Sequence, residues 1–407
     1  MHPTGYWSAA AMMKDSQNHR DPMEFNHLHL YVDDLAHWRD QFVQRWGGQA
    51  QAVPPSVADH TALICLGRVP LVLSAPRTPQ DAVATYLRQH PLGVGDIAFW
   101  VPDLEAALAR LTAHDGPPPS PIVEDLAGGR WCQVQGWGSL RHTLVQSARP
   151  MAWVPGVGTI PTQDALSTGD APFIDHIDHG VINVPVGQLA AAVDWYVQRF
   201  GFQPQQEFTI DTPWSGLRSQ VLAHPHGGAT LPINEPTTAN SQVQEFLHWN
   251  RGPGVQHVAL HTSDITQTVQ RLKTLGITFL DVPDGYYQAL AERPGYGVQP
   301  RDGATLPSVP GTASSDYLSS HPLIQDLVRL NILVDWDSQT PQAKLLQTFT
   351  QPVFNQPTLF FEIIQRQSAW AGTQPILAQG FGERNFKALF EAIEQEQRKR
   401  GSLVWGG

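Results

Sequence analysis

The stretch Gly254-Val255-Gln256-His257-Val258-Ala259-Leu260 decides the fold, because a glycine turn opens directly onto an apolar strand that carries one histidine. The same pattern occurs earlier, at Gly93-Val94-Gly95-Asp96-Ile97-Ala98-Phe99-Trp100, where Asp96 stands at the position of His257. A periodic helix is predicted after each copy, over residues 104–112 and 265–275. We therefore predict a duplicated module whose second copy holds a metal ion that the first has lost.

Composition narrows the class of protein. A chain of 407 residues with 41% hydrophobic content can bury sizeable cores and is long enough for two or three domains. The net charge of -11 argues against binding to nucleic acid or to an anionic membrane surface. The two cysteines, Cys65 and Cys132, are too few for a disulfide scaffold, which favours the reducing cytoplasm. No apolar run approaches the roughly 20 residues that span a bilayer.

The first half of the chain reads as two βαβββ units side by side. A strand over 24–32 places His27, His29 and Tyr31 on one face, and a helix over 35–46 ends at two glycines. Strands are predicted at 61–66, 70–74, 131–134 and 142–146, with a further helix at 81–90. Residues 1–22 are polar and irregular, without the apolar core of a signal peptide, and are predicted to be a disordered extension or the product of a misplaced start.

The second half repeats this pattern. A strand with His179 is followed by a helix over 189–200 that again ends at glycine. Strands are predicted at 215–223, 230–234, 242–250, 344–349 and 358–365, with a long surface insertion at 281–320 and another at 367–379. The predicted fold is therefore α+β, with a domain at 23–150 that lacks a metal, a linker at 151–172 and a catalytic domain at 173–401 that ends in a helix over 384–400.

Three residues of the second half can form a metal site. His179 and His257 lie on the first and middle strands of the module, and Glu362 lies inside an apolar strand, where burial without a compensating cation is costly. Two imidazoles and one carboxylate match the ligand set of non-haem Fe(II) enzymes. The separations along the chain are too large for a compact helical motif, so the ligands must converge from separate strands.

Each of these residues also has an ordinary explanation. A lone strand histidine is usually a core residue, and Glu362 could be an ion-pair partner of Arg366. His176 is an alternative to His179, but only His179 keeps the spacing to the following helix. In the first half the matching positions read His27, Asp96 and either Gln146 or Ser147, which is not a ligand set. The contrast between the halves favours a metal in the second only.

Several long motifs resemble the 4-hydroxyphenylpyruvate dioxygenase family of the vicinal oxygen chelate superfamily. They lie at 178–185, 231–236, 241–246, 254–260, 345–349 and 357–366, and in Gly380-Phe381-Gly382 with Asn385-Phe386. The opening at Met23 looks most like the cyanobacterial branch. The resemblance implies two tandem barrel-like domains with a C-terminal lid helix, Fe(II) bound by His179, His257 and Glu362, and a homodimer or homotetramer associating through the first domain. It also implies conversion of 4-hydroxyphenylpyruvate and O2 to homogentisate and CO2 in tyrosine catabolism and quinone or tocopherol supply.

The resemblance also implies the residues around the substrate. Polar contacts are expected from Ser219, Asn234, Gln242 and Gln256, although strand alternation would turn Gln256 away from the face of His257. Alternation places Phe360 on the face of Glu362, and Gln347 on the face of Phe349. Phe349, Phe360 and Phe386 are expected to enclose the substrate ring. The lid is expected to present its inner residues: Asn385, Phe386, Leu389 and Phe390.

One departure and two alternatives stay open. Arg384 stands where the family has a glycine in the turn before the lid helix, and it would be strained if that position needs positive φ. Hydroxymandelate synthase, a relative with the same substrate and metal, is an alternative, and the bulky Phe349 favours homogentisate as the product. A non-enzymatic module that sequesters a small molecule is the third hypothesis, which the intact ligand set disfavours.

Overall fold

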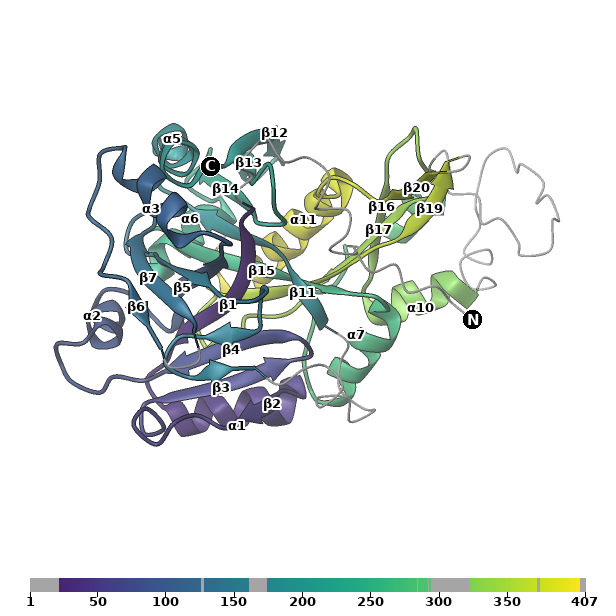
Figure 1. Ribbon diagram of the computed structural model, residues 1–407. Coiled ribbons are helices and arrows are strands. Elements are labelled where there is room, and N and C mark those ends of the chain that lie inside the picture. The colour runs from purple at the N-terminus through teal and green to yellow at the C-terminus, as the bar shows by residue number, and fades with distance from the viewer. Residues whose placement is uncertain are drawn as a thin grey trace.

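A computed structural model describes residues 22–125, 128–160, 174–283, 285–291, 293, 322–371 and 374–402. Two eight-stranded sheets dominate it, one in the first half (22–160) and one in the second half (174–402) (Figure 1). In each sheet the two central strands pair antiparallel. Parts of the expected N-terminal extension, linker and insertion, at 1–21, 161–172 and 294–320, lie outside the described residues.

The strand order is the same in both sheets. The first runs β2 (Gln49–Gln51), β3 (Thr61–Leu66), β4 (Val69–Ser74), β1 (Glu24–Tyr31), β5 (Gly93–Trp100), β8 (Arg141–Gln146), β7 (Arg130–Gln135) and β6 (Val123–Glu124). The second runs β12 (Gln203–Asp211), β13 (Gly216–Ala223), β14 (Thr230–Pro236), β11 (Ile174–Asn183), β15 (Gly254–Thr262), β18 (Phe360–Arg366), β17 (Lys344–Phe349) and β16 (Leu333–Trp336). This repeated order confirms the predicted tandem arrangement of βαβββ modules.

The helices repeat in the same way. In the first half they are α1 (Leu35–Trp46), α2 (Ala82–Gln89) and α3 (Leu104–Thr112); their counterparts are α5 (Leu189–Phe200), α6 (Gln242–Asn250) and α7 (Ile265–Thr274). The first helix of each half ends on a left-handed glycine, Gly47 at φ 66° and Gly201 at φ 77°. Glycine adopts this conformation without a steric penalty, so the predicted helix ends are explained by these two residues.

The prediction of a strand over 242–250 is wrong, because these residues form α6. The Ser241 hydroxyl accepts a hydrogen bond from the Val243 amide and caps the helix. The buried residues of α6 recur at helical spacing: Gln242, Val243, Phe246, Leu247 and Asn250. The edge strand β12 and the elements α10 (Pro322–Leu330) and β16 were not predicted.

The expected insertions and linker contain structure of their own. The first insertion includes α8 (Tyr286–Ala291), and the second forms a hairpin of β19 (Ser368–Ala371) and β20 (Gln374–Leu377). In the linker, β9 (Trp153–Val154) and β10 (Gly158–Thr159) form a short ribbon. Val154 packs with the buried residues of β3 and β4, so this part of the linker belongs to the core of the first half.

The two halves share one hydrophobic core. Trp46 of α1 meets Phe361 of β18 edge to face, with ring centroids 5.0 Å apart. A helix of the second half also contacts the sheet of the first, because the hydroxyl of Tyr196 on α5 lies 3.0 Å from Nε2 of His142 on β8. The chain closes on α11 (Glu383–Arg400), drawn in yellow in Figure 1, which packs against α6 and β16. Across the described residues, no helix combines the length and apolar character needed to cross a membrane.

Candidate metal centre

Three adjacent strands bring His179, His257 and Glu362 together. In the register of β11, β15 and β18, Ala259 is the partner of both His179 and Glu362, and His257 lies two residues before Ala259. Side chains two residues apart on a strand share a face. The three functional side chains therefore surround Ala259, whose small methyl group leaves room between them.

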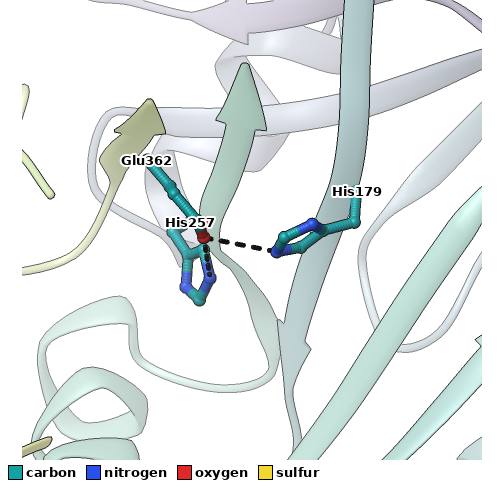
Figure 2. Close-up of side chains that lie close together, drawn as sticks. All are labelled: His179, His257 and Glu362. Carbon is teal, nitrogen blue, oxygen red and sulfur yellow. Dashed lines mark ion pairs between the residues drawn. The ribbon is translucent and has the colours of Figure 1, made fainter. Parts of the chain in front are cut away.

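The ligand atoms lie at the separations that a shared ion requires. Oε2 of Glu362 is 3.4 Å from Nε2 of His179 and 3.7 Å from Nε2 of His257, and one ligand atom from each residue lies within 4.8 Å of the others. Neighbouring ligands about 2.1 Å from one metal ion are roughly 3 Å apart. Figure 2 shows both imidazoles directed toward the Glu362 carboxylate, and all three side chains are at most 3% exposed.

A buried ion pair orients His179. Its Nδ1 lies 2.8 Å from Oδ1 of Asp178, which leaves Nε2 facing Glu362. Burial opposes a charge on the imidazole, but the carboxylates of Glu362 and Asp178 raise the pKa of His179 to about 9. Burial likewise opposes the charge of Asp178, and the Arg366 guanidinium outweighs it and holds the pKa of that carboxyl well below its usual range.

The partner of Nδ1 of His257 is neutral. Its Nδ1 lies 3.3 Å from the amide oxygen of Gln256, and its ring stacks on Phe360 with centroids 4.8 Å apart. Burial and the nearby charge of His179 hold the pKa of His257 well below its usual range. A neutral imidazole is the form that binds a metal.

The donor set fits a divalent transition metal. Two imidazole nitrogens and one carboxylate oxygen leave coordination positions open, as in non-haem Fe(II) oxygenases. The raised pKa of His179 shows that this cluster favours a positive charge beside Glu362. A bound divalent cation would supply that charge in place of the proton on His179.

Polar contacts connect Glu362 to the start of α11. The Gln347 amide donates to Oε1 of Glu362 at 2.8 Å and to the Phe381 carbonyl at 3.2 Å, and its oxygen lies 2.8 Å from the Asn385 amide. A Cβ on Gly382, at φ 66°, would lie 2.4 Å from the Gln347 oxygen. Only glycine therefore allows the backbone to approach Gln347 so closely.

The predicted aromatic residues separate into two groups. Phe349 and Phe360 lie beside the metal ligands, with ring centroids 6.5 Å and 4.8 Å from that of His257. Phe386 instead packs edge to face on Phe208, in a cluster that also contains Phe390. Leu389 is buried in the main core, together with Phe349 and Phe360.

The predicted polar residues include several with unpaired buried atoms. Ser219 and Asn234 are cross-strand partners on β13 and β14, and Asn234 donates to the Asn183 side-chain oxygen at 3.3 Å. Within the described part of the chain, the Ser219 hydroxyl, Oδ1 of Asn234, Oε1 of Gln242 and Nδ2 of Asn183 make no hydrogen bond. Buried polar atoms normally have partners, so these atoms are suited to bind a polar ligand.

Four residues near the site were not assigned a role from the sequence. Asp178 and Arg366 orient His179; Arg366 makes its ion pair with Asp178, and not with Glu362 as considered above. Phe381 meets His179 edge to face at 5.2 Å. Asn183 lies four residues after His179 on the same strand. Strand spacing could have indicated Asn183, whereas the Asp178–Arg366 pair joins residues 188 apart.

Arg384 is accommodated without backbone strain. The positive φ angles of this turn fall on Gly380 and Gly382, and Arg384 already lies in α11. Its guanidinium pairs with Asp335 at 3.0 Å, and its amide donates to the same carboxylate. The backbone strain considered for Arg384 is therefore not present, and the residue anchors the start of α11 instead.

Comparisons with known proteins find relatives over most of the chain. Residues 174–299 match the model of the Glyoxalase/Bleomycin resistance protein/Dioxygenase superfamily. An uncharacterised protein of Synechocystis sp. is 34% identical, with 93% of this chain and 99% of that protein covered. The 4-hydroxyphenylpyruvate dioxygenases of Danio rerio and Caenorhabditis elegans are 35% and 36% identical, with 81% and 82% of this chain and 78% and 80% of theirs covered.

A solved structure extends the similarity to the whole fold. A mutant of 4-hydroxymandelate synthase from Streptomyces coelicolor has a TM-score of 0.73 and 27% identity, with 93% of this chain and 99% of that chain covered.

Proposed function

The chain belongs to the 4-hydroxyphenylpyruvate dioxygenase family, and we propose that it converts 4-hydroxyphenylpyruvate and O2 to homogentisate and CO2. We assign Fe(II) to the site formed by His179, His257 and Glu362. The observation that carries this proposal is the convergence of these three buried side chains within 4.8 Å of one another. When bound, Fe(II) supplies chelation of the 2-oxo acid and the redox chemistry toward O2.

The protein's own residues orient the substrate. Ser219, Asn234 and Gln242 bind its polar groups, a role supported by their unpaired buried atoms. These groups are neutral, so they can bond a phenol without adding charge to the cavity. Phe349 and Phe360 hold the ring beside the metal, a role supported by their contacts with His257.

Gln347 and Asn385 connect the carboxylate of Glu362 to the lid helix α11. Gln347 fixes one oxygen of Glu362, which leaves Oε2 facing the histidines. Asn385 is fully buried and extends this contact to α11. The helix thereby excludes water from the reacting groups, which protects a reactive site from side reactions.

A cavity beside α11, not lined by the metal ligands, is smaller than the proposed substrate. Gln242, Gln256 and Phe360 share a cavity of about 30 Å³ with Ile393 and Glu396 of α11. A site for an aromatic acid needs about 300 Å³ or more. We propose that α11 moves outward to admit the substrate and then returns.

The alternative function is 4-hydroxymandelate synthase, with oxidation at the benzylic carbon of the same substrate. The observation in its favour is the similarity to the Streptomyces coelicolor structure over 99% of that chain. Phe349 fills the space beside His257, where a smaller side chain would let the benzylic carbon approach. This supports homogentisate as the product.

The test is substrate-dependent oxygen uptake by the full chain after anaerobic Fe(II) loading, with product identification by mass spectrometry. We expect homogentisate, one CO2 per O2, and no uptake by Glu362→Ala. Formation of 4-hydroxymandelate without homogentisate would establish the alternative. Binding of the substrate with no oxygen uptake would instead support a sequestering module.

We also propose domain bounds of 23–150 and 173–401, a cytoplasmic location and a homodimer or homotetramer. The unpaired buried cysteines Cys65 and Cys132 support a reducing compartment. Light scattering of the purified chain tests the assembly.

A further inference from the structure

Arg366 contacts two parts of the molecule at once. It is the last residue of β18, four residues after Glu362, and its side chain is 14% exposed. Toward β11, Nε and Nη2 donate to the two oxygens of Asp178 at 2.7 Å and 2.8 Å. Toward the segment before α11, Nη1 donates to the carbonyls of Gly380 at 2.8 Å and Ala378 at 3.3 Å.

The first set of contacts determines the orientation of His179. Asp178 accepts both donors of the guanidinium fork and also contacts Nδ1 of His179. A bidentate pair of this kind fixes the plane of the carboxylate. Without Arg366 the buried carboxylate would lose its charge partner, and the imidazole would lose the geometry that directs Nε2 at Glu362.

The second set determines where the lid begins. Gly380 precedes Phe381, whose ring meets His179 edge to face and lies 6.0 Å from the guanidinium of Arg366. The Phe381 carbonyl accepts from Gln347, which also donates to Glu362. The backbone that leads into α11 is thus attached near two of the metal ligands.

We propose that Arg366 is a positioning residue that couples metal binding to docking of α11, because one guanidinium holds both the Asp178–His179 pair and the 378–380 segment. This rests on the proposed metal at His179, His257 and Glu362. Coupling of this kind is reciprocal. A metal that fixes His179 favours the docked helix by some factor, and docking of the helix raises the affinity for the metal by the same factor. His257 differs from His179 in this respect, since its Nδ1 contacts the neutral Gln256.

The variants separate this role from simple anchoring of the lid. Arg366→Met removes both sets of contacts, and Arg366→Lys keeps the charge but loses the planar fork. Arg384→Met is the matched control, because Arg384 anchors the start of α11 through Asp335 and Trp336. Within the described residues it bonds neither to Asp178 nor to the three ligands. Thermal unfolding identifies the variants that fold; if Arg366→Met does not, Arg366→Lys decides.

Co(II) is the probe, with calorimetry for affinity, absorption for ligand geometry and hydrogen exchange for α11. We expect Arg366→Met to weaken Co(II) binding by about 10- to 100-fold, the usual effect of losing an outer partner of a ligand, and Arg366→Lys by about tenfold. Both should change the Co(II) spectrum and abolish the protection of α11 that Co(II) gives the parent chain. Arg384→Met should weaken protection equally with and without Co(II), with affinity and spectrum unchanged.

Two kinds of failure are distinguishable. Unchanged affinity and spectrum in both Arg366 variants, or equal protection of α11 in the parent chain with and without Co(II), would overturn the coupling and leave the metal site standing. If the parent chain does not bind Co(II), or Glu362→Ala binds it equally well, both the metal site and the coupling are overturned.

Discussion

The two halves of the chain have the same strand order and differ in what their corresponding positions do. In the second sheet, Ala259 lies opposite both His179 and Glu362. In the first sheet, Ala98 lies opposite His27, and the register of β5 and β8 places Thr143 on its other side. The position corresponding to Glu362 is therefore Thr143, and the prediction of Gln146 or Ser147 is wrong. In the first half, the Thr143 amide and hydroxyl both donate to Asp96, at 2.9 Å and 2.6 Å.

The same contrast holds for the polar residues beside the ligands. Thr61 and Ser74 are cross-strand partners in the first half, as Ser219 and Asn234 are in the second. The Ser74 hydroxyl lies 2.9 Å from that of Thr61 and 2.8 Å from Nε2 of His29. At these positions the first half pairs its hydroxyl groups, whereas the second leaves atoms of Ser219 and Asn234 unpaired within the described residues. We propose that the capacity to bind a ligand depends on this difference between the two halves.

The largest expected effect comes from the carboxylate ligand. Glu362→Ala should abolish oxygen uptake and weaken Co(II) binding by more than the roughly 100-fold upper value for loss of an outer partner. Thr143→Val, at the corresponding position, should leave both properties within about twofold. Calorimetry and oxygen uptake check this, and a comparable loss in Thr143→Val would show that the first half takes part in catalysis.

Asp96→Ala tests whether the polar cluster of the first half is structural. Loss of the carboxylate leaves the buried amide and hydroxyl of Thr143 without their acceptor. The free energy of unfolding should fall by roughly 3 to 4 kcal/mol, while Co(II) affinity stays within about twofold. Urea denaturation and calorimetry give the two values. A tenfold loss of affinity with unchanged stability would contradict the assignment.

The pKa values of the two corresponding histidines shift in opposite directions. Burial, with the charge of His29, lowers the pKa of His27 to about 3, whereas that of His179 is raised to about 9. Below pH 6.5 the unfolded chain binds a proton at His27 that the folded chain does not, so stability falls with decreasing pH.

His27 should therefore lower the free energy of unfolding by roughly 3 kcal/mol between pH 6.5 and pH 4. His27→Gln should remove this part of the slope, and substitution of the exposed His37 by glutamine should keep it. Denaturant titrations across this range measure the slopes. Equal slopes in the parent chain and His27→Gln would mean that His27 does not stay neutral in the folded state.

The smallest expected effect compares the two hydroxyl positions. Ser219→Ala should raise the KM for 4-hydroxyphenylpyruvate about tenfold and change stability little, because its oxygen makes no hydrogen bond within the described chain. Thr61→Val should lower stability by about 1 kcal/mol and leave KM unchanged. Steady-state kinetics and denaturation distinguish the two. A raised KM in Thr61→Val together with lost stability in Ser219→Ala would contradict the proposed difference between the two halves.

Much of the fold could be predicted from local pattern. Gly47 and Gly201 mark the ends of the first helices, and the Gly93 and Gly254 segments begin corresponding strands, so the duplication is visible in the sequence. The convergence of His179, His257 and Glu362 follows from the cost of burying a carboxylate in an apolar strand. For α6, the helical spacing of Val243, Phe246 and Leu247 was present but was read as an apolar strand.

Other features depend on long-range geometry. The correspondence of Thr143 with Glu362 needs the strand register, including the irregularities in the pairing of β1 with β5. The pair of Asp178 and Arg366 joins residues 188 apart, and no local spacing indicates it. The pKa values of His27 and His179 shift in opposite directions although both residues lie on equivalent strands. The difference therefore arises from the neighbours of each histidine.

The contact of Trp46 with Phe361 makes the first half a packing support for the strand that carries Glu362. Phe361 and Glu362 are consecutive and point to opposite faces of β18, so the strand that presents the carboxylate is supported from behind by the other half of the chain. Excision of the second half to obtain a minimal enzyme would expose that support to solvent. We therefore expect that a shortened chain would keep the geometry of β18 only if another packing surface replaced the first half.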